Sequence, residues 1–142
     1  MNLREKANAA SLGERPEGNL KKVFLAAPFL IGSWFGQGQP DDKSEMWLIR
    51  QQANGNFQAQ FRTCIKGKAH DDLESGHWSL AGDMETLMVL SVDGKPASQG
   101  ESYKILSHDA GKQVYRYMAS GFVYTSRRVD GDFELPSCEA IS

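Results

Sequence analysis

The stretch Phe57-Gln58-Ala59-Gln60-Phe61-Arg62-Thr63-Cys64-Ile65-Lys66 decides the fold of this chain. Its larger apolar residues alternate with polar ones, so the two sets of side chains fall on opposite faces of an extended strand. We expect Phe57, Phe61 and Ile65 to face the interior together with Ala59 and Thr63. The outward face is then formed by Gln58, Gln60, Arg62, Cys64 and Lys66. Asn54-Gly55 just before the stretch is a strong signal for a hairpin turn. The stretch therefore predicts a half-buried strand in an antiparallel sheet.

Similar runs recur along the chain, separated by Gly, Asp and Asn. The expected strands cover residues 30–36, 45–52, 57–66, 75–80, 86–92, 102–106, 113–119 and 122–129. Residues 67–73 and 96–100 are expected to be irregular. Because the turns are too short for crossover helices, consecutive strands should pair antiparallel, and eight of them leave two exposed edges unless the sheet closes. We therefore predict an all-β fold, an eight-stranded antiparallel up-and-down barrel, with an open sheet or a sandwich as the alternative.

Composition fits one domain of this kind. The chain has 142 residues, of which 40% are hydrophobic and 24% are charged, enough for one packed core. Sixteen Lys and Arg against eighteen Asp and Glu give a net charge of -2. This balance argues against nucleic acid and anionic membranes as main partners, because both attract clustered basic residues. No apolar run approaches the roughly 18 to 20 residues of a membrane-spanning helix.

The N-terminal region divides into two parts. Residues 1–19 are small and polar and are expected to form a flexible arm, and residues 20–142 are expected to form the single domain. Lys21-Lys22 precede the apolar run Val23–Ile31, which superficially resembles a signal peptide but is followed by no small-residue cleavage site. We interpret this run as a short apolar helix or extended segment that packs on the domain, with Pro28 ending it.

The sequence motifs of known catalytic sites are missing from the chain. It contains no Gly-x-Ser-x-Gly, no phosphate-binding glycine loop and no His-Glu-x-x-His. The segment Asp71–Glu74 is acidic, but it lacks the alternating oxygen ligands of a calcium loop. The histidines, which lie in polar turns or in a strand without a second ligand nearby in sequence, are His70, His77 and His108. We therefore predict no catalytic residue, no metal site and no cofactor.

Polar residues within apolar strands are the candidates for ligand contacts. Arg116 shares a strand face with Val114 and Met118, whereas Tyr115 and Tyr117 occupy the other face. The alternation does not decide which face is inside. An inward Arg116 would need a partner, because an isolated buried charge is costly, and that partner would be a ligand carboxylate, an internal Glu or a tyrosine hydroxyl.

The two cysteines, Cys64 and Cys138, lie far apart in the sequence. They form no C-x-x-C motif, which excludes a zinc knuckle and a thioredoxin-type redox site. They are either two independent thiols or one long-range disulfide, and a disulfide would indicate an oxidising compartment.

Gly32-Ser33-Trp34 stands at the head of the strand series, and Arg127 and Arg128 stand near its end. This arrangement, over roughly residues 30–129, resembles the lipocalins and the wider calycin superfamily, in particular their compact bacterial members. Barrels of that superfamily open with Gly-x-Trp after a short apolar or helical segment. Their Trp packs across the closed end, and an Arg of the last strand commonly stacks on it. The resemblance implies that Trp34 lies at the closed end with Arg127 or Arg128 against its ring.

The resemblance also implies a function. It suggests a non-catalytic protein that holds a small apolar or amphipathic ligand inside the barrel. An inward Arg116 would then bind a ligand carboxylate, as in the fatty-acid-binding barrels of the superfamily. The main alternative is a barrel that is filled by its own side chains and acts as a structural or interaction module. The third candidate is an isomerase or hydrolase that uses the cavity. A homodimer is compatible with each of these functions. The residues expected to contact a ligand are Phe57, Phe61, Tyr103, Arg116, Met118 and Tyr124.

Lipocalins commonly tether their C-terminal segment to the barrel wall by a disulfide. The resemblance therefore implies a bond between Cys64, on the outer face of its strand, and Cys138, in the tail. With this bond we expect a periplasmic or exported protein, and without it a cytoplasmic one.

Overall fold

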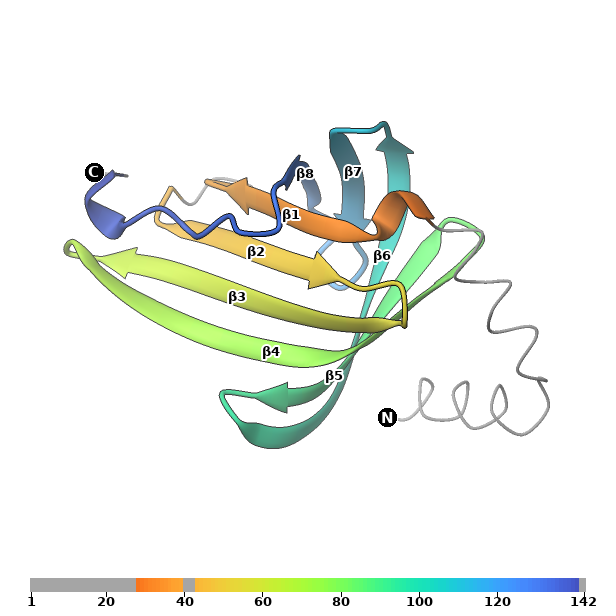
Figure 1. Ribbon diagram of the computed structural model, residues 1–142, viewed down its shortest axis with the longest axis horizontal. Helices are drawn as coiled ribbons and strands as arrows, with labels where there is room; N and C mark the ends of the chain where they lie inside the picture. Colours follow the sequence, from red (N-terminus) through yellow and green to blue (C-terminus); the bar gives the residue numbers. More distant parts are fainter. Residues whose placement is uncertain (1–27, 40–42, 141–142) are drawn as a thin grey trace.

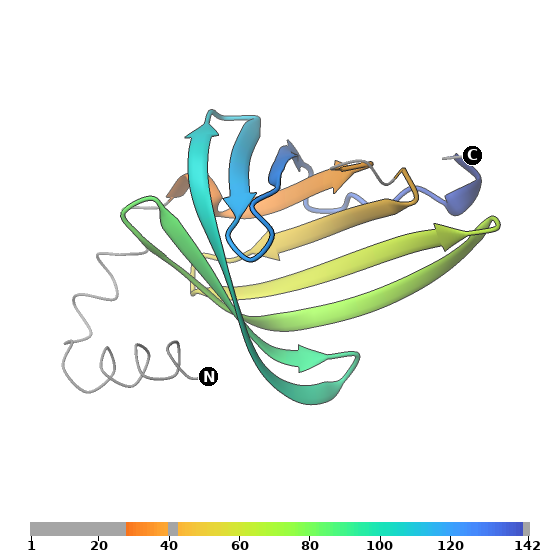
Figure 2. The ribbon, with the colours of Figure 1, turned by 180° about the vertical axis from the view of Figure 1, so that it is seen from behind.

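The computed structural model describes residues 28–39 and 43–140. Each strand pairs antiparallel with the next and the last pairs with the first, so the sheet closes into a barrel (Figures 1 and 2). The strands are β1 (Gly32–Gln37), β2 (Glu45–Gln51), β3 (Asn56–Ile65), β4 (Lys68–Ala81), β5 (Met84–Val92), β6 (Lys95–His108), β7 (Lys112–Tyr117) and β8 (Val123–Val129). The prediction of an all-β, eight-stranded antiparallel barrel is confirmed.

The described chain begins with a single 3-10 turn, η1 (Pro28–Leu30), and ends with another, η2 (Cys138–Ala140). Most of the expected apolar helix, residues 23–27, and the expected arm over residues 1–19 lie outside the described residues. Pro28 starts the η1 turn, whose last residue, Leu30, is fully buried in the barrel end. This short segment therefore packs on the domain as an apolar plug.

Two strands are longer than the sequence pattern indicates, and both expectations of irregular structure are wrong. Lys66 and Gly67 have φ of 53° and 78°, which produces a tight turn after which Lys68 pairs directly with Ile65. Residues 67–73 were expected to be a loop because they are polar on both faces, but most of them form the first half of β4, which extends past the barrel rim (Figure 1). Residues 96–100 likewise belong to β6.

The β3–β4 hairpin is polar at its outer end. Arg62 and Asp71 form an ion pair across the two strands, with Nε and Oδ1 2.8 Å apart. Ile65 is on the interior face of β3, but it is 50% exposed because its strand has already left the barrel. The expectation of a buried Ile65 is therefore corrected, whereas Phe57, further down the same face, is buried.

One end of the barrel is closed by a continuous apolar cluster. The connections β2–β3, β4–β5 and β6–β7 meet at this end together with η1, as the antiparallel order requires. Buried side chains of the cluster are Leu30, Phe57, Ala59, Trp78, Leu80, Leu87, Val89 and Ile105. Filling this end leaves the opposite end, with the β1–β2, β3–β4, β5–β6 and β7–β8 connections, as the way into the barrel.

A second apolar cluster lies outside the barrel wall. Phe35, Met46 and Leu48 point outward from β1 and β2 and are covered by Leu135 of the C-terminal tail. The tail runs along the outside of these strands (Figure 1), and a disulfide joins Cys64 of β3 to Cys138. The tail thus completes a small outer core and is fixed covalently to the wall.

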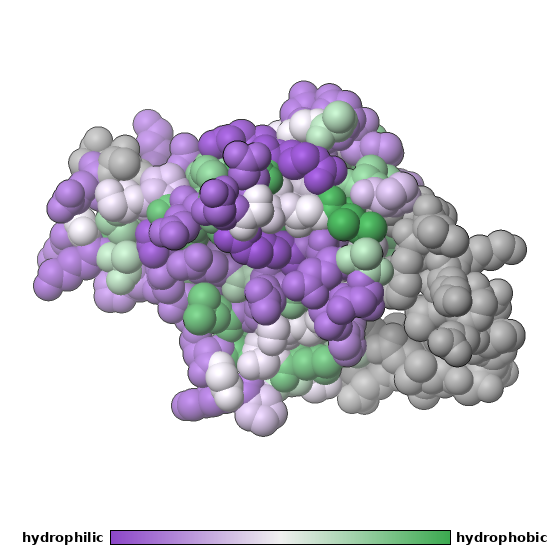
Figure 3. Space-filling model, viewed as in Figure 1, coloured by the Kyte–Doolittle hydropathy of each residue, from purple (hydrophilic) through white to green (hydrophobic). Residues whose placement is uncertain are grey.

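The surface is largely hydrophilic. On the face drawn in Figure 3, polar residues predominate and apolar residues form small separate groups. Within residues 28–39 and 43–140, no helix has the length and hydropathy needed to cross a membrane.

Candidate functional site

The barrel encloses a cavity of about 370 Å³ above the apolar cluster. The lining residues nearest the closed end come from the halves of the strands that adjoin that end. They are Trp34, Gln51, Glu85, Leu87 and Gln113. The middle and mouth are lined chiefly by Trp47, Ile49, Phe61, Thr63, Asp72, Glu74, Glu101, Tyr103, Tyr115, Tyr117, Tyr124 and Ser126. The wall is therefore partly aromatic and partly polar.

Four tyrosines form one side of the cavity. The rings of Tyr103 and Tyr117 stack with centroids 5.1 Å apart, and Tyr103 meets Tyr115 edge-on at 5.5 Å. Tyr115 and Tyr124 lie nearly parallel at 6.1 Å. Because β6, β7 and β8 are neighbours, alternate residues of the three strands bring these rings together. They give the cavity a continuous aromatic wall with hydroxyl groups on it.

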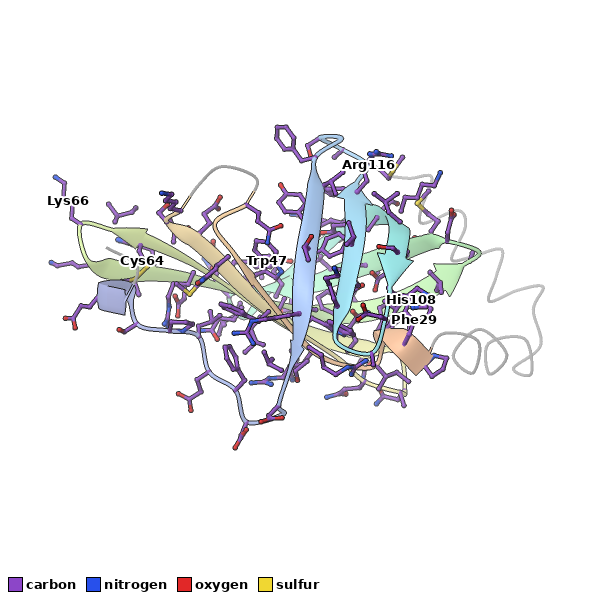
Figure 4. The ribbon with its side chains drawn as sticks, turned by 90° about the horizontal axis from the view of Figure 1, so that it is seen from above. Phe29, Trp47, Cys64, Lys66, His108 and Arg116 are labelled. Atoms are coloured by element: carbon purple, nitrogen blue, oxygen red, sulfur yellow. A yellow bond between two sulfur atoms is a disulfide. The ribbon has the colours of Figure 1, made fainter. Side chains whose placement is uncertain are left out.

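Trp47 lies beside these rings, in the middle of the barrel (Figure 4), and meets Tyr124 edge-on. Its indole Nε1 donates to Ser126 Oγ at 2.9 Å, and Ser126 Oγ also lies 2.9 Å from the Tyr115 hydroxyl. A side chain at Gly36 on the neighbouring strand would collide with the indole ring, so only glycine leaves room for it there. The aromatic wall is thus held by a buried polar chain through Trp47, Ser126 and Tyr115.

Glu85 is a buried carboxyl group at the inner end of the cavity, 6% exposed. Gln51 Nε2 of β2 donates a short hydrogen bond to Glu85 Oε2. Burial raises the pKa of the Glu85 carboxyl from 4.5 to about 7, and the hydrogen bond from Gln51 opposes this only in part. Glu85 can therefore change its charge close to neutral pH.

A second acidic group lies toward the mouth. Burial, together with the negative charges of Glu101 and Asp72, raises the pKa of Glu74 from 4.5 to about 7. The Tyr103 hydroxyl donates to Glu101 Oε1 at 2.7 Å, and burial together with that carboxylate raises the pKa of Tyr103. Tyr103 therefore remains a neutral hydrogen-bond donor, and the cavity mouth carries a negative potential.

Gln113 of β7 is 3% exposed and lines the inner end of the cavity. Its Oε1 accepts no hydrogen bond from any residue that the structure describes. Most buried polar atoms in proteins have a partner, because an unsatisfied one costs about 1–3 kcal/mol. Gln113 thus presents an open acceptor at the cavity wall.

The closed end is secured by Arg128, which the sequence left as one of two candidates beside Trp34. The Arg128 guanidinium lies 4.4 Å from the Trp34 ring centroid, whereas Arg127 lies over Phe35 and Phe133 on the outer surface. Arg128 also donates to the carbonyl oxygens of Phe29, Ile31 and Ala110 at 3.2, 2.8 and 2.8 Å. A side chain at Gly32, which has φ of 135°, would collide with this guanidinium. The Gly-x-Trp pattern therefore makes room for the Arg128 contact.

The predicted ligand-contacting residues divide into three groups. Phe61, Tyr103 and Tyr124 line the cavity. Phe57 belongs to the apolar cluster at the closed end. Arg116 lies on the opposite face of β7 from Tyr115 and Tyr117, and Figure 4 shows it at the barrel edge, away from Trp47. Met118 follows β7 in a turn and is 45% exposed. Neither residue lines the cavity, so the expectation that they contact a ligand there is corrected.

The histidines do not reach the cavity. His77 is exposed and lies 2.9 Å from Asn56 Oδ1, and the His108 ring stacks on Phe29 with centroids 3.8 Å apart (Figure 4). Among the described residues, no three His, Cys, Asp or Glu side chains are placed to hold a metal ion. The cavity chemistry is therefore that of carboxyl, hydroxyl and amide groups.

Three polar residues of the inner cavity, Gln51, Glu85 and Gln113, are not among the residues predicted from the sequence. A signal for Glu85 existed, since it shares a strand face with the apolar Leu87 and Val89. The strand was expected to begin at Thr86, one residue too late to include it. No family model, curated protein or solved structure matches this chain. Its function must therefore be inferred from the cavity itself.

Proposed function

We propose that this protein binds a small amphipathic molecule inside its barrel, in the manner of a lipocalin-like carrier. The observation that carries the proposal is the cavity of about 370 Å³, which is closed at one end and lined by both aromatic and polar side chains. Ligand sites in proteins have this size and this mixture of apolar walls with a few placed polar groups. A barrel filled by its own side chains, the main alternative, would leave no such space.

A neutral fluorescent probe tests access to the cavity. N-phenyl-1-naphthylamine should increase its fluorescence on binding the wild-type protein, because the probe moves from water into an aromatic environment. Ile49 lines the cavity, and Ile49→Trp should reduce the volume and weaken probe binding at least tenfold. Leu90→Trp is the matched control, since Leu90 is exposed on the outside of β5.

The outcome is decided by the two variants together. Loss of probe binding in Ile49→Trp but not in Leu90→Trp supports ligand binding inside the barrel. Equal probe binding by both variants would contradict it and would favour a structural or interaction module. Native mass spectrometry of the freshly purified protein complements this test, because a retained ligand would appear as a mass above that of the chain.

A cavity enzyme is the second candidate, and one observation favours it. Glu74 and Glu85 both line the cavity, and both have a pKa of about 7, which suits general acid–base catalysis near neutral pH. This reading predicts that a compound released from the purified protein is converted on incubation, and that Glu74→Gln abolishes conversion but keeps binding. Recovery of the unchanged compound would favour the carrier.

We propose further that the protein works in an oxidising compartment, either the periplasm or outside the cell. The disulfide between Cys64 and Cys138 supports this location, because such bonds are rare in proteins kept in a reducing cytoplasm. Fractionation of cells that express the protein from its natural gene, followed by immunodetection, tests the location directly.

A further inference from the structure

The charged side chains in the described lining of the cavity are all acidic. Five carboxyl groups line it, from Glu45, Asp72, Glu74, Glu85 and Glu101. The described part of the cavity wall contains no Lys, Arg or His. Like charges around a cavity with low-dielectric walls focus the potential and raise the local concentration of the opposite ion. The cavity is therefore unfavourable for an anionic ligand and favourable for a cationic one.

A second observation independent of these charges points to a hydrogen-bond donor. Gln113, which is 3% exposed, lines the cavity, and its Oε1 has no donor among the residues that the structure describes. Glu85, which also lines the inner end of the cavity, accepts a described side-chain hydrogen bond from Gln51 Nε2 at its Oε2. A bound N–H group would satisfy these acceptors, whereas a carboxylate or an ester would leave them unpaired.

The aromatic wall fits the same kind of ligand. Tyr103, Tyr115, Tyr117 and Tyr124 place ring faces and edges around one side of the cavity, and Trp47 contacts Tyr124 edge-on at 5.6 Å. Tyr and Trp rings attract cations over their faces and pack against apolar groups. A metal ion fits the cavity less well, because no three His, Cys, Asp or Glu side chains of the described residues are placed to bind one.

We infer that the cavity selects a small organic amine in its cationic form, with the ammonium group toward the carboxylates and Gln113 and an apolar or aromatic group against the tyrosines. This inference rests on the proposed binding function and deepens it by naming the ligand class. It replaces the fatty acid that an inward Arg116 would have implied, since Arg116 lies outside the cavity.

Three probes of nearly equal size and different charge test the inference. Isothermal titration calorimetry at pH 8 compares 2-phenylethylamine, which is cationic, with 2-phenylethanol, which is neutral, and 3-phenylpropanoate, which is anionic. The amine should bind at least tenfold more tightly than the alcohol, and the propanoate should show no measurable binding. Equal affinities for amine and alcohol, no binding of the amine, or preferential binding of the propanoate would each overturn the inference.

Matched variants locate the effect. Glu85→Gln keeps the size of the side chain and removes its charge, so amine binding should weaken at least tenfold and alcohol binding should change less than twofold. Glu101→Gln serves as a second variant, because Tyr103 can still donate to the amide oxygen. Glu134→Gln is the control, since Glu134 is exposed in the tail and does not line the cavity. Equal amine affinities in all three variants would contradict the assignment.

The neutral probe separates the two proposals. If N-phenyl-1-naphthylamine binds and is displaced by 2-phenylethanol as well as by 2-phenylethylamine, the barrel binds ligands but does not select amines. If the probe is unaffected by Ile49→Trp, ligand binding inside the barrel fails, and the amine inference fails with it. Probe binding by Glu85→Gln and Glu101→Gln also shows that these variants have folded.

Discussion

Arg128 illustrates how one side chain holds three segments together. Its guanidinium covers the ring of Trp34, which is 1% exposed. It also donates hydrogen bonds to the carbonyl oxygens of Phe29 in η1 and of Ala110 in the β6–β7 connection. A cation over a desolvated indole contributes up to about 2 kcal/mol. Arg128→Met keeps an apolar stem but loses this contact, so its free energy of unfolding in urea should fall by about 2 kcal/mol.

Arg127→Met is the matched control for that measurement. Arg127 is exposed and lies over Phe35 and Phe133 at 4.9 and 5.6 Å, where such contacts contribute about 0.5–1 kcal/mol. It should therefore lower stability by less than half as much as Arg128→Met. Equal losses from the two variants would show that the Trp34 contact has no special role.

Glu85 makes the stability of the protein depend on pH. In the unfolded chain this carboxyl loses its proton near pH 4.5, whereas in the folded protein its pKa is about 7. Between these values the folded state binds more protons, so stability falls as pH rises from about 4.5 to about 7 and then levels off. The difference of 2.5 pKa units corresponds to about 3 kcal/mol for this buried group.

Urea unfolding at several pH values between 5 and 8 checks this expectation. The wild type should be less stable at pH 7.5 than at pH 5, and Glu85→Gln should lose most of that slope because its side chain does not titrate. Glu74→Gln should reduce the slope less, since Glu74 is only half-buried. A Glu85→Gln variant with the same slope as the wild type would place the titrating group elsewhere.

At the level of single elements, the C-terminal tail depends on its disulfide. The bond spans a sequence separation of 74 residues, and the chain-entropy estimate for closing such a loop is about 4 kcal/mol. The double variant Cys64→Ala with Cys138→Ala should lose stability of this order in urea. Iodoacetamide should label no cysteine in the unfolded, unreduced protein and two after reduction. Two labelled cysteines before reduction would mean that the bond does not form.

Elements could be predicted from the sequence where one face is apolar and the other polar. The interior face of β3 follows from its alternation, and Phe57 and Phe61 lie where it places them. The outer half of β4 is polar on both faces, because it projects into water, and so it resembles a loop in sequence. β7 carries apolar residues on both faces, so its alternation could not identify the Tyr115 face as the inner one.

At the scale of the whole molecule, closure of the barrel could be predicted, and its cavity could not. Closure follows from the number of strands and the need to cover two edges. Whether a cavity remains depends on the combined volume of the side chains that all eight strands point inward. Gly36 on β1, for example, leaves room for the ring of Trp47 on β2. Such sums involve residues distant in sequence. The unpaired Oε1 of Gln113 could not be predicted either, because the lack of a donor among the described residues depends on how the interior is assembled.

The bond between β3 and the tail has a mechanical consequence. A force that pulls on the two chain ends passes from Cys64 to Cys138 through sulfur, so residues 65–137 carry no load, although they contain five of the eight strands. Only β1, β2 and most of β3 can be stretched while the bond persists. Reduction should add about 260 Å to the extended length in an optical-trap experiment, at about 3.5 Å per residue. Within an oxidised chain, most of the barrel is therefore shielded from tension applied at its ends.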